Sequence, residues 1–167
     1  MKNLILTLLL AAASYSTGLA QVSHSGKIEF GYLKFQNINR ESDWIVDYIK
    51  GDYNGLDVNL VNSIRFKEKF TVGVGIGYLN ILNKSGISLF SDFEYTPLKK
   101  KLSPLLNTKI GYSNTWNRYE DGTGTALIEL GAGLSYRLTG RTRTYIQSGI
   151  LFTQQSSFLP IKIGVQF

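Results

Sequence analysis

The stretch Phe70 to Tyr78 reads Phe-Thr-Val-Gly-Val-Gly-Ile-Gly-Tyr, and it decides the fold. Its even-numbered positions are apolar or aromatic, and its odd-numbered positions are one threonine and three glycines. A period of two indicates a β-strand. The second face carries almost no side chains, as expected where a strand lines a crowded interior. We infer that this face lines a narrow barrel and that the apolar face contacts lipid.

Composition narrows the class of protein. The chain of 167 residues is one domain in size, with 43% hydrophobic residues and 17 glycines. It has no cysteine, which excludes disulfides, thiolate zinc sites and a cysteine nucleophile. After the N-terminal segment no run reaches eighteen apolar residues, so no membrane-spanning helix is expected. The net charge is +6, but the basic residues are scattered along the chain, which argues against nucleic-acid binding.

The first twenty residues have the three parts of a secretory signal peptide. Met1 to Asn3 gives a short positive start, Leu4 to Ala13 an apolar run, and Gly18 to Ala20 a small-residue cleavage site. We expect cleavage after Ala20, a leader over 21–26 without a strand pattern, and a barrel domain over 27–167. The alternative is an N-terminal helix that stays attached.

In the remaining chain, eight segments, that of Phe70 to Tyr78 included, alternate between apolar residues and polar or small residues. They are 27–35, 56–66, 70–78, 87–96, 105–113, 125–138, 142–153 and 158–167. The connections after the second, fourth and sixth segments are short or basic, and those after the first, third and fifth are longer, which is the plan of outer-membrane barrels. Apolar-face aromatic residues gather at the strand ends, as expected at two membrane interfaces. Those at the short-turn end are Phe66, Phe70, Tyr95, Tyr136 and Phe167, and those at the loop end are Tyr78, Tyr112 and Phe152.

The inward face of these segments collects charges of both signs. The positive residues are Lys27, Arg65, Lys109, Arg137, Arg143 and Lys162, and the negative residues are Glu29, Asp57, Asp92, Glu94 and Glu129. Buried charges are tolerated when they are paired, and six against five is nearly balanced. The pattern predicts a structural network of salt bridges that fills the lumen. Eight strands leave an interior just wide enough for side chains, so a water-filled pore is not expected.

The mature chain resembles the small eight-stranded outer-membrane barrels of the OmpA and OmpX type. The resemblance covers 27–167 and rests on the signal peptide, the eight alternating strands, the loop asymmetry and the terminal strand that ends at Phe167. It implies an antiparallel up-and-down transmembrane β-barrel in the outer membrane of a Gram-negative cell. It also implies that the barrel lies in a bilayer that contains lipopolysaccharide and that the barrel-assembly machinery inserts it. It carries over no catalytic residues, cofactor or metal.

Periodicity alone leaves a soluble lipocalin-like barrel as the structural alternative, with its apolar face inward around a ligand. Two enzymatic alternatives are a nucleophile pair of His24 and Ser25, as in lipid-modifying barrels, and an acid/base pair of Asp92 and Glu94. His24 lacks partners for a metal site.

We expect no enzyme, but a structural or surface-interaction protein, with a narrow gated conduit for small or apolar solutes as the alternative. Aromatic residues in the predicted outer loops are candidates for surface contact. They are Trp44, Tyr48, Tyr53, Trp116 and Tyr119.

Overall fold

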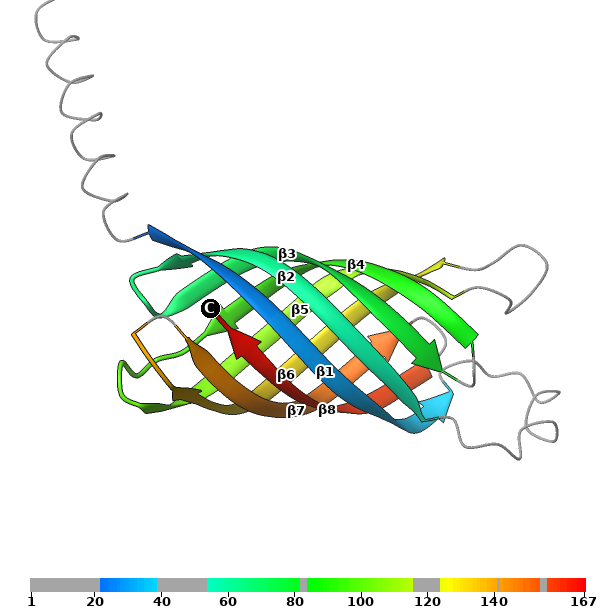
Figure 1. Cartoon of the computed structure of the whole chain (residues 1–167). Helices are drawn as coiled ribbons and strands as arrows, with labels where there is room; N and C mark the ends of the chain where they lie inside the picture. The colour runs from blue at the N-terminus through cyan, green and yellow to red at the C-terminus, as the bar shows by residue number, and fades with distance from the viewer. Residues whose placement is uncertain (1–21, 39–53, 82–83, 116–123, 141, 154–155) are drawn as a thin grey trace, which may run out of the picture.

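Eight antiparallel strands form one closed barrel in the computed structural model, which describes residues 22–38, 54–81, 84–115, 124–140, 142–153 and 156–167. The strands are β1 (Val22–Ile38), β2 (Gly55–Phe66), β3 (Phe70–Ile81), β4 (Lys84–Tyr95), β5 (Leu102–Thr115), β6 (Gly124–Arg137), β7 (Arg143–Thr153) and β8 (Ser156–Gln166). Each strand pairs with the next, β8 pairs with β1, and all tilt around the axis (Figure 1). The prediction of an eight-stranded up-and-down barrel is confirmed. The described residues contain no helix long and apolar enough to cross a membrane.

The two faces of the sheet point as the sequence predicted. On β3, Val74 and Ile76 are exposed on the outer wall, whereas Gly75 between them is buried. The same alternation runs along the other strands: apolar side chains cover the outside, and most of the buried side chains inside are polar or charged. A lipocalin-like barrel requires the reverse arrangement, so that alternative is excluded. An apolar outer wall of this extent is stable only in contact with lipid.

Aromatic residues mark both edges of the apolar wall. Phe70 stacks on Tyr95 with ring centroids 4.6 Å apart at the short-turn end, and Tyr78 and Tyr112 are exposed near the loop end. Eight residue steps separate Phe70 from Tyr78, which on a tilted strand is roughly 20 Å across the membrane. This distance is suitable for the hydrocarbon layer of a bilayer.

The first strand begins earlier than the sequence indicated. β1 starts at Val22, so the predicted leader from Val22 to Gly26 is part of the barrel. Gly26 and Phe167 exchange two backbone hydrogen bonds of 2.8 and 2.9 Å, and Ser63 donates to the Ser25 carbonyl at 2.9 Å. Backbone hydrogen bonds to the neighbouring strands therefore make Ser23 to Gly26 part of β1. The hydropathy of Ser-His-Ser-Gly does not indicate a strand.

Other strand boundaries also differ from the prediction. β4 starts at Lys84, so most of the expected loop over 81–86 is strand, and only 82–83 separate β3 from β4. β5 starts at Leu102 and contains Pro104, and β8 contains Pro160. Pro104 lies near the start of its strand, and Pro160 lies close to an irregularity in the β1–β8 pairing, which are positions that tolerate a missing N–H donor.

The glycines of the inner face lie opposite large inward side chains. Gly75 pairs with Phe90, and Gly164 pairs with Tyr145. A Cβ atom at Gly75 would lie 2.6 Å from the Phe90 ring, and one at Gly164 would overlap the Tyr145 ring. Small and large residues therefore alternate around the lumen and fill it without overlap.

The hairpin between β2 and β3 has a strained backbone. Lys67 and Glu68 have φ angles of 51° and 58°, in the left-handed region, and the Lys69 N–H donates to the Phe66 carbonyl at 3.1 Å. Positive φ at both central residues is the geometry of a type I′ turn, which matches the twist of the flanking strands. The charged turn thus connects β2 and β3 through only three residues, 67–69.

The facing glycines Gly131 and Gly149 provide a matched test of this packing. A Cβ atom at Gly149 would overlap the backbone carbonyl of Leu130, whereas one at Gly131 would have its nearest neighbours at 3.7 Å. We expect Gly149→Ala to lower the free energy of unfolding by about 1–3 kcal/mol. Gly131→Ala should leave it unchanged or raise it by up to about 1 kcal/mol. Urea unfolding in detergent micelles measures both, and equal losses in the two variants would contradict the packing.

Candidate functional site: the charged lumen

The centre of the lumen is built from lysines that contact carboxylates on other strands. The Lys162 ammonium on β8 lies 2.6 Å from a carboxylate oxygen of Asp57 on β2 and 2.7 Å from one of Glu129 on β6. All three side chains are buried, and that of Lys162 is only 1% exposed. Asn59 donates to Asp57 at 2.7 Å, which completes this half of the network.

A second group of contacts surrounds Lys27 on β1. Its ammonium lies 2.6 Å from Asp92 and 3.3 Å from Glu94, both on β4, and 3.7 Å from Glu29 on β1. Asn107 donates to the other oxygen of Asp92 at 2.9 Å. Two carboxylates bound to one lysine are ion-pair partners, so the arrangement does not provide a free acid/base pair.

One ion pair crosses the whole lumen. Lys109 on β5 pairs with Glu29 on β1, and these strands are four positions apart in a ring of eight. The Tyr145 hydroxyl on β7 donates to the second oxygen of Glu29 at 2.6 Å. Glu29 therefore links three sides of the barrel. Side chains that bridge opposite walls leave no continuous water-filled path through this level.

The three arginines predicted to line the lumen, Arg65, Arg137 and Arg143, do not join the lysine–carboxylate network. Arg137 lies at the rim of the short-turn end, where its side chain is 24% exposed and pairs with Glu68 at 3.4 Å. Arg65 contacts the Ser25 hydroxyl at 3.4 Å, and Arg143 donates to the Thr96 hydroxyl at 3.1 Å. The sequence placed all three arginines in one network with the other charges, and the structure puts them in a separate layer.

An apolar cluster closes the lumen near the loop end. It contains buried inward side chains from β1, β3, β6, β7 and β8. They are Leu33, Leu79, Leu127, Leu151 and Phe158. No prediction from the sequence covers this cluster, although strict alternation from Lys27 through Glu29 and Gly31 puts Leu33 on the inner face. The interior is therefore filled by an apolar layer as well as by salt bridges.

The remaining candidate residues do not form a site. His24 is exposed on the outer wall and Ser25 is buried on the inner wall, so the two side chains lie on opposite faces of β1. The described part of the chain contains no group of His, Cys, Asp and Glu that could hold a metal ion. The loop aromatic candidates Trp44, Tyr48, Tyr53, Trp116 and Tyr119 lie outside the described residues.

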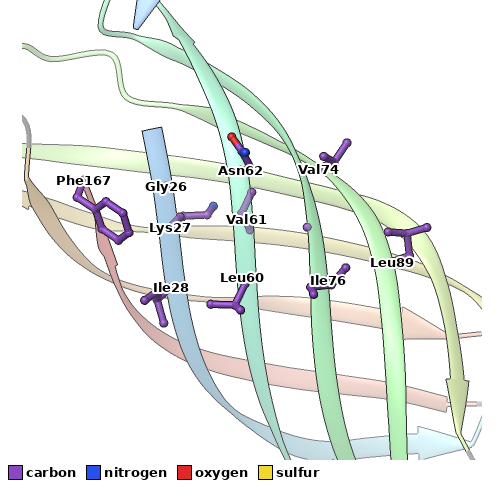
Figure 2. Close-up of a pocket in the computed structure, with 11 residues that line it drawn as sticks. Gly26, Lys27, Ile28, Leu60, Val61, Asn62, Val74, Ile76, Leu89 and Phe167 are labelled. Carbon is purple, nitrogen blue, oxygen red and sulfur yellow. The ribbon is translucent and has the colours of Figure 1, made fainter. Parts of the chain in front are cut away.

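A shallow groove of about 400 Å³ lies on the outer wall across β1 to β4 (Figure 2). Its exposed lining includes Leu60, Val74, Ile76 and Phe167, with the polar Asn62 among them. Lys27 also borders the groove, but its ammonium points into the lumen, toward Asp92. The groove therefore presents apolar surface to lipid and offers no reactive group.

Comparison with known proteins supports the fold. Neisserial surface protein A (NspA) matches with a TM-score of 0.63 at 10% sequence identity, over 87% of this chain and 97% of that chain. The N-terminal β-barrel domain of Pseudomonas aeruginosa OprF matches with a TM-score of 0.55 at 15% identity, over 88% and 100%. A de novo designed transmembrane β-barrel gives 0.51 at 17% identity, over 86% and 92%. No protein-family model and no curated protein sequence matches the chain. With its apolar outer wall, the chain has the fold of an integral outer-membrane barrel.

Removal of Lys162 tests the energetic role of the central network. Lys162→Met leaves the carboxylates of Asp57 and Glu129 buried without their cation, and we expect a loss of about 3–5 kcal/mol in the free energy of unfolding. The triple variant Lys162→Met, Asp57→Asn, Glu129→Gln should recover most of this loss, because no charge is then unpaired. Lys100→Met, in an exposed turn, is the control and should stay within about 0.5 kcal/mol of the parent. Parent-like stability of Lys162→Met in urea unfolding would contradict the role.

Proposed function

We propose that the protein is a non-enzymatic element of the outer membrane, a plugged barrel that presents its longer loops at the cell surface. The observation that carries the proposal is the filled lumen. The Lys109–Glu29 pair crosses the centre, and an apolar cluster closes the side nearer the loops. A barrel filled in this way acts as a rigid support in the bilayer.

The distribution of connections supports a surface role. The connections at the short-turn end are 67–69, 96–101 and 138–142. At the other end 39–54 and 116–123 are longer, but 82–83 and 154–155 have only two residues each, so the predicted longer loop after β3 is wrong. In outer-membrane barrels the short turns face the periplasm and the longer loops face the outside. Both longer connections carry the aromatic residues that the sequence analysis identified as candidates for contact. Loops on a rigid scaffold are common places for recognition.

The positions of the two candidate catalytic pairs support a non-enzymatic role. His24 and Ser25 lie on opposite faces of β1, and Asp92 and Glu94 both contact Lys27. General acid–base catalysis requires a group within hydrogen-bond reach of a substrate. The buried carboxylates are in contact with lysines.

Planar-bilayer recordings distinguish the plugged barrel from the gated conduit. We expect the reconstituted parent to give no steady conductance, because the ion pairs and the apolar cluster fill the lumen. Glu129→Gln and Arg137→Gln should behave as the parent does. A steady conductance in the parent that changes in either variant would overturn the plugged barrel in favour of a conduit for small solutes.

Binding experiments with loop variants test the surface role. We expect the purified parent to retain at least one extracellular partner that is lost when Trp44, Tyr48 and Tyr53 are all replaced by serine, because aromatic residues dominate binding at protein surfaces. Gly131→Ala, which changes only the lumen, is the matched control and should retain the partner. The same set of retained proteins for the loop variant and for the parent would contradict a role for this loop.

A further inference from the structure

The charges of the lumen, together with Glu68 in the exposed turn at its short-turn rim, balance as a whole but not layer by layer. The central layer holds Lys27, Lys109 and Lys162 with the five carboxylates of Glu29, Asp57, Asp92, Glu94 and Glu129, a net charge of −2 when all are ionised. The layer at the short-turn end holds Arg65, Arg137 and Arg143 with the one carboxylate of Glu68, a net charge of +2. An excess of two positive charges is therefore concentrated at one end of the barrel.

Two of these arginines have no carboxylate at ion-pair distance among the described residues, and Glu94 and Glu68 act on them only from farther away. Arg65 is 7% exposed and Arg143 is 5% exposed, and within the described residues neither has a carboxylate oxygen within 4.0 Å. Their contacts are the neutral hydroxyls of Ser25 and Thr96. A buried charge normally has a counter-charge, because its transfer out of water is costly. The positions of Arg65 and Arg143 therefore suit an anion.

The unpaired polar atoms of this layer point to the same kind of ligand. Within the described residues, the buried side-chain nitrogens without a hydrogen-bond partner include Nε of Arg65, Nε of Arg137 and Nε2 of Gln166. Gln166 faces Arg143 across the β7–β8 pairing, so it belongs to the same end of the barrel. All three atoms are donors. A group of unpaired donors with excess positive charge can be satisfied together by one acceptor with negative charge.

The cluster reaches solvent at the short-turn end through Arg137. The Arg137 side chain is 24% exposed at the rim, and the adjoining turns carry further exposed lysines at Lys67 and at 99–101. These lysines raise the local concentration of anions near the opening. Short turns face the periplasm in outer-membrane barrels, so the ligand would arrive from that side.

We propose that Arg65, Arg137 and Arg143, with Gln166, form a binding site for a small soluble oxyanion of the phosphate type at the periplasmic end of the lumen. The two excess positive charges suit a phosphate group, which carries a charge of roughly −1.5 to −2 at neutral pH. Guanidinium groups present several donors in one plane and are well suited to phosphate oxygens. The site lies inside the barrel wall, so its ligand is a free ion, whereas lipid headgroups contact the outer perimeter.

Calorimetric titration of the mature barrel with inorganic phosphate tests the site. The protein is held in a detergent without phosphate, and the ionic strength is kept constant with sodium chloride. We expect saturable binding of one phosphate per chain. Arg143→Gln and Arg137→Gln should each weaken it roughly tenfold or more, because a charge-assisted hydrogen bond is lost. Because Arg137 lies at the rim, Arg137→Gln leaves the buried layers intact. Weaker binding in this variant therefore cannot be attributed to a folding defect, as it could be in Arg143→Gln.

A matched control separates the cluster from general attraction to a basic surface. The double variant Lys99→Gln, Lys100→Gln removes two exposed charges from the same end and should change phosphate affinity by less than about threefold, since such charges are screened by salt. No saturable binding by the parent, or equal weakening by the arginine and lysine variants, would overturn the proposal. A response to phosphatidylglycerol in the micelles without any response to inorganic phosphate would overturn it as well, because it would place the ligand on the outer perimeter.

Discussion

The structure depends on one constraint: the interior of an eight-stranded barrel must be filled by its own side chains. The glycines and the charged residues of the inner face meet this constraint together. Gly31 lies between Asp57 and Lys162 in the sheet, and a Cβ atom there would overlap the Asp57 carboxylate and lie 3.0 Å from the Lys162 side chain. A glycine on one strand thus makes room for a lysine or a carboxylate from its neighbours. The glycine-rich inner face of β3 and the charged inner faces of β1 and β8 therefore fill the same lumen together.

The same constraint explains why buried charges are tolerated at the centre. A buried ion pair contributes little net stability, because desolvation offsets much of the attraction. Its cost is lowest where each charge has several partners, and Lys27 and Glu29 each contact more than one partner. Pairs such as Lys109–Glu29 also join strands that are far apart in the sheet, so they can form only when the barrel is closed in its native register. We infer that the network contributes more to the specificity of closure than to stability.

The sequence predicted the faces of the strands well and their interactions less well. A period of two assigns Val74 outward and Gly75 inward without any knowledge of the partner strands. It cannot tell which lysine meets which carboxylate, because Lys27 and Asp92 are 65 residues apart and their heights depend on the stagger of the whole barrel. The error at the leader had a different cause. Residues 22–26 are short and polar, and only the backbone ladder with β2 and Phe167 shows them to be strand.

The order of layers along the axis makes the barrel asymmetric. From the loop end to the short-turn end, the interior passes from an apolar cluster through a central layer of lysines and carboxylates to a layer of arginines. A solute entering from the loop end would have to displace Leu33 and its neighbours and then break buried ion pairs, and both steps are costly. From the other side, the rim residue Arg137 is already in contact with solvent. The lumen is thus closed at the loop end and reaches solvent through Arg137 at the short-turn end, a geometry that suits binding at one end better than passage through the barrel.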